Sequence, residues 1–376
     1  MTHRNVYLIS VAFFFIFFGF GTAQQYLVIL FAADGRGFLA LMSLFVLYGA
    51  FLLTGIAVAK FIPMFGGLKK SLLFGALTYV LFTAGIALNS TPILLAVSVL
   101  VGIGAGFLWV SSGQIITDSS SEGSMGKNLA YQVIGQYSGN ISGLYAGRYL
   151  IDIFPREGVY LVLSGCVLVG VILLLGVHPL KEEVRKKIFR PFYAVKPQML
   201  ALFPLIFGAY YLQGQVFTAM NFIIVGVLGV AFIPHVVSVL KVSNIAGSFL
   251  SGKLSDRHRK AFVLAALLAV ALCGAGLFVA TKEFVPLLAG AILLGFSMAS
   301  IYPVCLSWLK ERIPDDEYLY ALGTFHIYTN VGVLAAITAN LWLPLGMSFL
   351  PGAVALLLAF AGIVAFDIIT KHNRDA

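Results

Sequence analysis

The stretch Phe232-Ile-Pro-His-Val-Val-Ser-Val-Leu-Lys241-Val-Ser-Asn-Ile-Ala-Gly-Ser-Phe-Leu-Ser-Gly-Lys-Leu-Ser-Asp-Arg257 decides the fold. Its length and apolar content are typical of a helix that crosses a membrane and ends in a charged turn. Lys241 lies about twelve residues from either end of this span, which at about 1.5 Å per residue is close to the middle of the bilayer. A lysine at that depth is unfavourable by roughly 2.5 kcal/mol or more unless it faces water, protein or a ligand.

The composition of the whole chain agrees with a membrane location. Of its 376 residues, 60% are hydrophobic and only 10% are charged, whereas a soluble domain carries about 25% charged residues. The apolar runs last about 20 residues, so we expect helices rather than the alternating strands of a barrel. The first run, residues 7–31, is too long for a signal peptide and has no cleavage-site pattern, so it is predicted to be a retained first span.

We therefore predict an all-α membrane protein with about twelve transmembrane helices in two six-helix pseudo-repeats. The spans lie near 7–31, 38–62, 71–89, 92–116, 128–153, 157–178, 199–223, 229–254, 261–281, 284–309, 318–341 and 345–369. Residues 1–178 are the N-terminal six-helix bundle, 179–198 a basic cytoplasmic linker, and 199–376 the C-terminal six-helix bundle. The linker is interpreted as a segment resting on anionic lipid, with a regulatory or partner-binding role as the alternative.

The basic residues are distributed unequally between the predicted loops. With the N-terminus inside, the outer side takes only Arg36, Arg148, Arg156 and Lys282, and the other basic loops lie on the inner side. Because inner loops are enriched in Lys and Arg, both termini are predicted to be cytoplasmic in a multi-pass protein of the cell membrane. The net charge of +9 is explained by this asymmetry, and no nucleic-acid partner is expected.

The two halves repeat one another at an offset of about 192 residues. Residues 55–70 correspond to 247–260 in place and charge, and residues 102–109 correspond to 294–302. A duplicated set of six helices around a basic linker is typical of a transporter, in which the substrate binds near the midplane between the repeats.

The segment Gly252-Lys-Leu-Ser-Asp-Arg-His-Arg-Lys260 resembles the cytoplasmic signature of the major facilitator superfamily, Gly-x-Leu-Ser-Asp-Arg-x-Gly-Arg-Arg. The glycine expected after His258 is missing, and the first-half copy, residues 60–70, has no acid. In that family the loop makes ion pairs that close the cytoplasmic side. The resemblance therefore implies a gate role for Asp256 and Arg257, and Lys60 is the candidate at the matching place in the first half.

A second resemblance is to the "uncoordinated" (Unc-type) branch of that superfamily. It covers only Gly104-Ala-Gly-Phe-Leu-Trp-Val-Ser-Ser-Gly-Gln114 and Gln24-Gln25-Tyr26-Leu27. That branch includes proteins better known as partners of other membrane proteins than as transporters. This resemblance keeps open the alternative of a non-transporting partner or regulator that retains the fold.

Polar residues inside the predicted spans are the candidate solute ligands. Gln132, Gln136 and Asn140 are spaced i, i+4, i+8, so they form one stripe that lines a cavity or makes interhelical hydrogen bonds. Lys241 and Asn244 share a face with Ser248, and no Asp or Glu lies in the middle of any span. We therefore interpret Lys241 as a ligand for an anionic or polar solute, with backbone carbonyls of a broken helix as the alternative partner.

His326 and Asn330 are spaced i, i+4 on the eleventh span. Because histidine titrates near neutral pH, His326 is the proton-coupling candidate, and a hydrogen-bonded core histidine is the alternative. In the resembling family the first, fourth, seventh and tenth helices line the central cavity. That resemblance adds Gln24, Trp109, Gln213 and Tyr302 as candidate cavity residues, although each could equally be a packing residue.

Several classes of protein are excluded by what the sequence lacks. It contains no phosphate-binding Gly-x-x-x-x-Gly-Lys-Ser/Thr motif, and its three cysteines fall in apolar runs without metal-ligand spacing. We expect no catalytic residue, no metal and no cofactor. The prediction is a monomeric secondary transporter, not an enzyme, that moves a small polar or anionic solute by alternating access.

Overall fold

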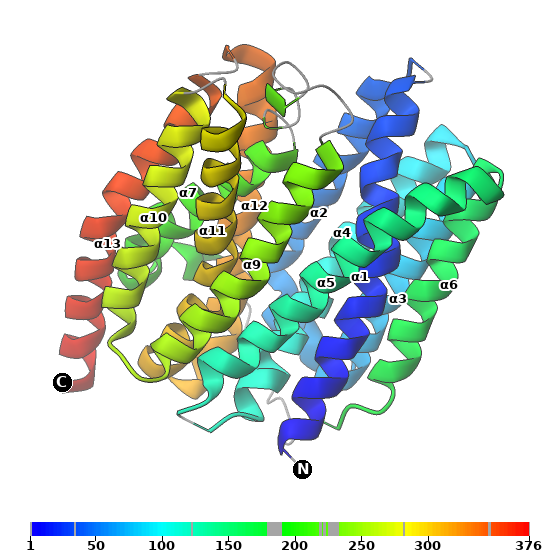
Figure 1. The fold of residues 1–376 in the computed structure, drawn as a ribbon. Coiled ribbons are helices and arrows are strands. Elements are labelled where there is room, and N and C mark those ends of the chain that lie inside the picture. Colours follow the sequence, from blue (N-terminus) through cyan, green and yellow to red (C-terminus); the bar gives the residue numbers. More distant parts are fainter. Residues whose placement is uncertain are drawn as a thin grey trace. The chain divides into compact units, whose positions relative to one another are not determined.

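The computed structural model describes residues 2–33, 35–121, 123–178, 190–217, 220, 223–224, 233–280, 283–344 and 347–375. Within these ranges the chain forms twelve α-helices and two short 3-10 helices, and no strand (Figure 1). Each predicted span overlaps one of these helices in the same order along the chain, with ends that differ by a few residues. The predicted all-α fold class is therefore confirmed.

The helices group into two compact units. Unit 1 comprises residues 1–120 and 131–189 and unit 2 comprises residues 121–130 and 190–376, so the first residues of α5 belong with unit 2. Unit 1 contains α1 (Thr2–Ala33), α2 (Gly37–Met64), α3 (Leu68–Ala87), α4 (Thr91–Asp118), most of α5 (Met125–Ile153) and α6 (Arg156–Leu174).

Unit 2 contains the remaining elements that the structure describes. These are η1 (Pro191–Val195), α7 (Pro197–Phe217), α9 (Ile233–Ser255), α10 (Lys260–Ala280), α11 (Phe284–Arg312), α12 (Asp315–Trp342), η3 (Met347–Phe349) and α13 (Leu350–Asp375). The predicted eighth span is thus α9, which carries Lys241 in its first half and Asn244 and Ser248 beyond it.

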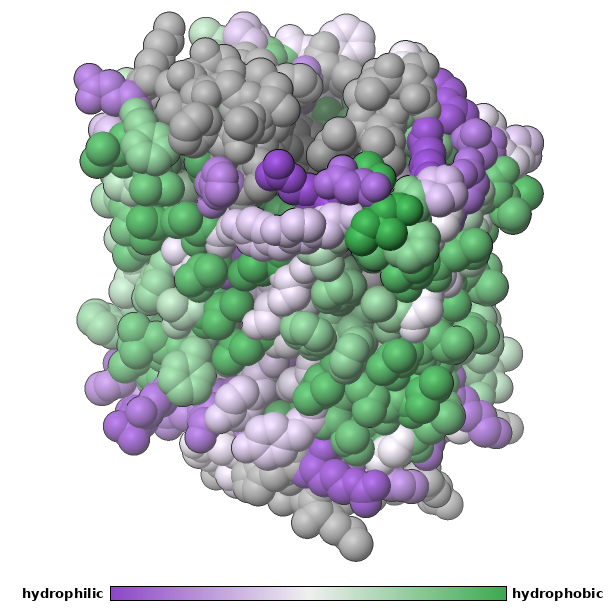
Figure 2. Space-filling view, turned by 45° about the vertical axis from the view of Figure 1, so that its right-hand side comes forward, coloured by the Kyte–Doolittle hydropathy of each residue, from purple (hydrophilic) through white to green (hydrophobic). Residues whose placement is uncertain are grey.

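Ten of the helices are long and apolar enough to cross a membrane. Among the described residues, α5 and α9 do not reach that criterion, because α5 carries the amide stripe and α9 carries Lys241 together with several serines. Figure 2 shows hydrophobic side chains over the middle of the face in view and hydrophilic side chains toward its two ends. The polar content of α5 and α9 is therefore an exception within an apolar bundle.

Glycines allow close contact between helix backbones in each unit. In unit 1, a Cβ atom on Gly135 or Gly139 of α5 would lie 2.0 or 2.1 Å from a carbonyl oxygen of α1. In unit 2, a Cβ on Gly247 of α9 would lie 2.0 Å from the carbonyl oxygen of Phe296, and one on Gly295 of α11 would lie 2.3 Å from that of Leu240. Since a larger side chain would force these backbones apart, the glycines fix the α1–α5 and α9–α11 pairs.

The described end of the predicted linker is held against α12. Residues 179–189 lie outside the described part. After them, Arg190 and Lys196 both form ion pairs with Glu317, at 2.6 and 2.8 Å, and the Tyr193 hydroxyl donates to the same carboxylate at 3.1 Å. Burial and the negative charge of Glu317 raise the pKa of Tyr193, which keeps the phenol protonated as a donor. Residues 190–196 are therefore held against the start of α12.

Candidate functional site

Lys241 is buried in α9 and has no polar partner in the part of the chain that the structure describes. Its side chain and backbone together are only 6% exposed. Among the residues that the structure describes, no hydrogen bond or ion pair involves its ammonium group. A charged lysine near the centre of a membrane helix is unfavourable by roughly 2.5 kcal/mol or more unless water, protein or a ligand compensates the charge. This residue is therefore the clearest candidate for a ligand-binding cation.

Three other polar residues of α9 share this condition. Ser238, Asn244 and Ser248 lie three residues before, three after and seven after Lys241, so all four lie on one helical face. Each is at most 7% exposed, and each has a buried side-chain oxygen with no hydrogen-bond partner in the described part of the chain. Buried polar groups are normally paired, so this face has unused capacity to bind a polar group.

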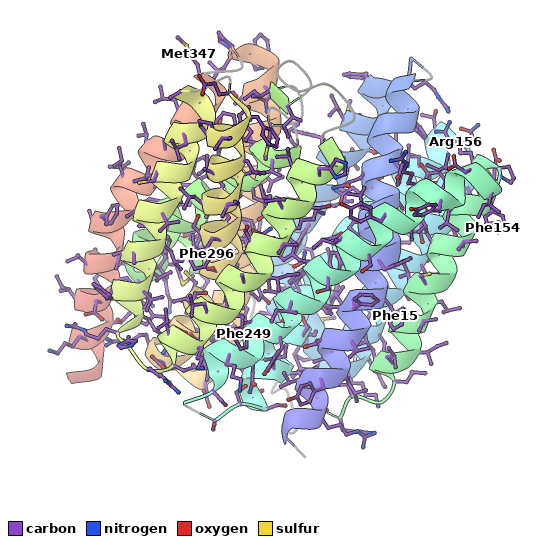
Figure 3. The ribbon with its side chains drawn as sticks, viewed as in Figure 1. Phe15, Phe154, Arg156, Phe249, Phe296 and Met347 are labelled. Atoms are coloured by element: carbon purple, nitrogen blue, oxygen red, sulfur yellow. The ribbon has the colours of Figure 1, made fainter. Side chains whose placement is uncertain are left out.

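Other serines of the same helix behave differently. Ser251 donates to the Ser248 carbonyl at 3.3 Å, and Ser255 donates to the Gly252 carbonyl at 2.8 Å. Serine hydroxyls in helices commonly donate to a backbone carbonyl of the preceding turn in this way. The unpaired hydroxyls of Ser238 and Ser248 are therefore a feature of the segment around Lys241 and not of α9 as a whole. Figure 3 shows the side chains of α9 and of its neighbour α11, with Phe249 and Phe296 labelled.

The gate candidate Asp256 follows directly after α9 and caps the start of α5. Its two carboxylate oxygens accept the backbone N–H groups of Gly126 at 2.8 Å and of Lys127 at 2.9 Å, and all three residues belong to unit 2. A carboxylate at a helix N-terminus is favoured both by these bonds and by the helix dipole. The resemblance implied an ion pair, but Asp256 binds backbone amides, and Arg257 and Lys60 are exposed.

We expect the variant Asp256→Ala to lose this cap and about 1–2 kcal/mol of stability, because two helical N–H groups lose their acceptor. The apparent Tm of the purified protein should then fall by roughly 2–4 °C for each kcal/mol. The variant Asp256→Asn keeps one acceptor and should lose less. Asp152→Ala, which removes an exposed acid, is the matched control, and an equal loss in this control would show that the cap contributes nothing.

Tyr302, His326 and Asn330 come together in unit 2. The ring centroids of Tyr302 and His326 lie 6.4 Å apart, and Phe325 makes an edge contact with Tyr302 at 5.7 Å and with Tyr210 at 5.9 Å. His326 is 4% exposed. The Asn330 side chain donates to the His326 carbonyl at 2.6 Å, so its amide nitrogen is engaged within its own helix. Gln213 of α7 is half-buried.

The candidates in unit 1 form mostly interhelical contacts. The Gln132 amide is fully buried and donates to the Ser112 hydroxyl of α4 at 2.9 Å. Gln24 of α1 donates to the Tyr48 hydroxyl of α2 at 3.3 Å. Trp109 makes edge contacts with the rings of Phe13 and Phe17 at 5.2 and 5.7 Å. The sequence left two roles open for the α5 stripe, cavity lining and interhelical hydrogen bonding. The Gln132–Ser112 bond is of the second kind.

The other two members of that stripe differ from Gln132. Gln136 is half-buried. Asn140 is 9% exposed. Its side-chain oxygen packs so closely against Gly21 of α1 that a Cβ atom on this glycine would clash with it. Of the three residues of the stripe, Gln132 thus contacts α4 and Asn140 lies against α1.

Two polar features were missed by the sequence analysis. Ser238 lies on the same face of α9 as Lys241. Its position three residues before the lysine would have indicated this from the sequence alone. Gln215, fully buried in α7, donates to the Ser348 carbonyl at 2.9 Å and accepts from Asn340 at 3.0 Å. The family resemblance pointed instead to Gln213, two residues earlier, because the sequence does not show which of these two glutamines is buried.

The comparison with known families decides the assignment of the chain. The model of the family described as Major Facilitator Superfamily matches residues 6–281 and 228–375. The chain belongs to the Major Facilitator Superfamily. This superfamily is one of membrane transporters and their relatives and not of enzymes, so the chain is an integral, multi-pass membrane protein.

Curated relatives connect the chain to the Unc-type branch. It is 29% identical over 157 residues to "Protein unc-93 homolog A" of Bos taurus and 27% identical over 148 residues to "UNC93-like protein 3" of Arabidopsis thaliana. These matches cover 42% and 39% of the chain, but only 32% and 31% of the relatives. The matched region thus spans about a third of the length of these relatives.

Solved transporters of the Major Facilitator Superfamily share the fold. The human organic anion transporter MFSD10 (TETRAN) superposes with a TM-score of 0.77 at 13% identity, over 96% of this chain and 99% of that one. The proton:xylose symporter XylE superposes with a TM-score of 0.75 at 14% identity, over 96% and 95%. At this level of identity the similarity establishes the fold and not the solute.

Proposed function

We propose that the protein is a secondary transporter that moves a small anionic or strongly polar solute by alternating access. Lys241 binds the anionic group, and Asn244, with Ser238 and Ser248 on the same face, supplies hydrogen bonds. The observation that carries the proposal is a lysine that is 6% exposed and has no polar partner among the described residues. Beside it on the same helical face are three buried side-chain oxygens that have no hydrogen-bond partner in that part of the chain. A ligand with a carboxylate or phosphate and hydroxyl groups would satisfy all four.

The remaining candidate residues have secondary roles in this proposal. Gln136, Gln213 and Tyr302 are the half-buried or aromatic groups that can approach the solute, and His326 is the group through which protons could be coupled to transport. Gln24, Gln132, Asn140, Trp109 and Asn330 already contact other helices or their own helix. We assign this second set to support of the bundle and only secondarily to binding.

The arrangement in the membrane is also part of the proposal. Both termini lie in the cytoplasm, because Lys and Arg are concentrated in the loops on that side. Residues 1–178 and 199–376 are the two halves that alternate, and residues 179–198 join them. Asp256 stabilises the state in which the cytoplasmic side is closed, since the helix that it caps begins at that side.

A thermal-shift screen of the purified protein tests the solute class. A ligand that binds the folded state raises the apparent Tm by mass action. Carboxylates and phosphorylated compounds should stabilise the protein, whereas neutral sugars and lipophilic cations at equal concentration should not. Stabilisation by neutral sugars or by cations alone would contradict a binding site built around Lys241.

A second candidate function is a membrane partner or regulator that does not transport. The observation in its favour is that the first-half loop, residues 60–70, has no acid, so it cannot supply the cap that Asp256 supplies in the second half. The unpaired polar face of α9 argues against this function, because a scaffold without a solute gains nothing from a buried lysine. Uptake measurements on pure protein in liposomes separate the two functions.

A further inference from the structure

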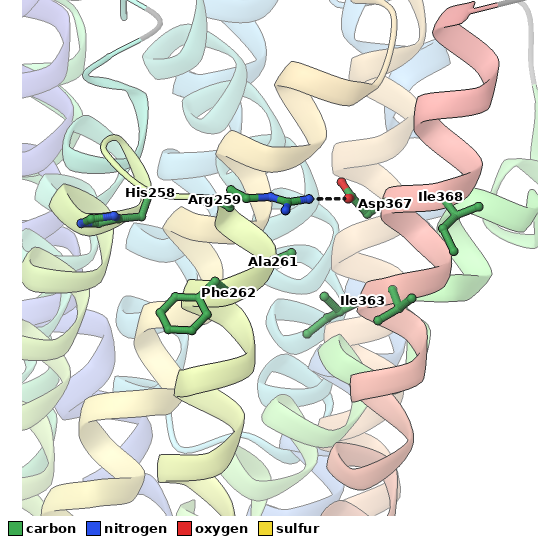
Figure 4. Close-up of a pocket in the computed structure, with 8 residues that line it drawn as sticks. His258, Arg259, Ala261, Phe262, Ile363, Asp367 and Ile368 are labelled. Carbon is green, nitrogen blue, oxygen red and sulfur yellow. Dashed lines mark hydrogen bonds and ion pairs between the residues drawn. The ribbon is translucent and has the colours of Figure 1, made fainter.

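A groove of about 550 Å³ lies between α10 and α13, away from the residues assigned to the solute. One side is formed by His258, Arg259, Ala261 and Phe262, and the other by Ile363, Val364, Asp367 and Ile368. Figure 4 shows residues of both sides and the contact between Arg259 and Asp367 that crosses the groove. All of these residues belong to unit 2.

The walls of the groove are apolar and open to the outside. Phe262 is 74% exposed, Ile368 64% and Val364 59%. All three lie in helices that are long and apolar enough to cross a membrane. In a bilayer such exposed side chains contact acyl chains, since lipid is the solvent of these helix faces. The walls therefore favour a hydrocarbon chain as the occupant.

The mouth of the groove carries an excess of positive charge. Asp367 accepts from Arg312 at 2.6 Å with one oxygen and from Arg259 at 3.3 Å with the other. The Arg312 side chain is 22% exposed, whereas the Arg259 side chain is 84% exposed. Arg312 thus balances the carboxylate, and Arg259 keeps most of its five donors available to another anion.

Neighbouring residues increase this excess of positive charge. His258 is exposed on the same loop, and Lys371 is exposed one helical turn beyond Asp367 on α13. Glu311, an acid near this end of unit 2, is paired with Lys260 at 2.5 Å. A mobile anion at the mouth would therefore meet cations, while Asp367 and Glu311 are each paired with a cation of their own.

We propose that this groove binds an anionic phospholipid. Its phosphate lies within reach of Arg259, and an acyl chain lies against Phe262, Val364 and Ile368. A basic pocket between transmembrane helices next to an apolar wall matches the headgroup and the tail of such a lipid at once. The planar guanidinium can hold two phosphate oxygens, which a lysine cannot do in the same way. The proposal involves no solute and does not depend on transport.

The test compares lipids added to the purified full-length protein in detergent. Dioleoylphosphatidylglycerol is expected to raise the apparent Tm in a saturable manner and to remain bound in native mass spectrometry. Dioleoylphosphatidylcholine, which has the same chains and no net charge, should have a much smaller effect. Glycerol phosphate, which has the anion without the chains, should have almost none.

Variants assign the effect to the groove. Arg259→Gln should weaken phosphatidylglycerol binding by about tenfold, Arg259→Lys should weaken it less, and Phe262→Ser should weaken it through the loss of chain contact. Lys253→Gln, which removes an exposed cation at the end of α9, should leave binding unchanged. The proposal is overturned if both lipids act equally, if glycerol phosphate acts as strongly as the lipid, or if Arg259→Gln and Phe262→Ser bind like the wild type.

Discussion

Replacing Lys241 with methionine is expected to weaken binding of the anionic solute by at least about 100-fold, which corresponds to about 2.8 kcal/mol. Removing one member of a buried charge pair typically has an effect of this size, because the remaining charge loses its partner in a medium that cannot solvate it. The measurement is the rise in apparent Tm as the stabilising anion is titrated against wild type and variant. Lys241→Arg keeps the charge and should retain part of the affinity.

The same variant has an expected effect on the unliganded protein that separates binding from structure. Lys241 is buried without a partner among the described residues, so methionine, which is apolar and of similar length, should raise the Tm of the unliganded protein. If Lys241 instead stabilised the unliganded protein through polar contacts, Lys241→Met would lower its Tm. Lys253→Met, which changes an exposed lysine of the same helix, should alter neither the Tm nor the affinity.

Replacing Gly247 with valine is expected to be the most damaging packing change. The new Cβ would lie 2.0 Å from the Phe296 carbonyl oxygen, with the carbonyl carbon at 2.7 Å. Both are backbone atoms and cannot turn aside, so α9 and α11 must separate. Overpacking of this kind reduces stability by about 3 kcal/mol, the upper part of the usual range. The apparent Tm should fall by roughly 6–12 °C.

Gly276→Val is the matched control for this change. Gly276 lies in α10, another apolar helix of unit 2, and beyond its own turn of helix no described heavy atom lies within 4 Å of the position that its Cβ would take. Valine should therefore be tolerated there, with a change in Tm of a degree or two. If both variants lost the same stability, the damage would come from valine in a membrane helix and not from the α9–α11 contact.

The helices themselves were predictable from the sequence because hydrophobicity and span length are local properties. Runs of about 20 apolar residues can only be helices in a bilayer, and ten of the described helices follow from such runs. Spacing also placed Lys241, Asn244 and Ser248 on one face, since helical periodicity is fixed by backbone geometry.

The partners of the polar side chains were not predictable, because they depend on which helices become neighbours. Gln132 bonds to Ser112, which lies on a different helix, and nothing in the spacing of α5 specifies that contact. Asp256 was expected in an ion pair but binds the N–H groups of Gly126 and Lys127. A backbone amide leaves no residue-specific mark in a sequence, so only the tertiary structure shows this cap.

The most direct test of the central claim is uptake of the stabilising anion into liposomes that contain only the purified protein. We expect uptake above that of protein-free liposomes that saturates with solute concentration, with Lys253→Met as active as the wild type and Lys241→Met at background. Solute uptake by Lys241→Met equal to that of the wild type would contradict the role of the lysine. Absence of uptake by the wild type for every anion that stabilises it would contradict the transport function itself.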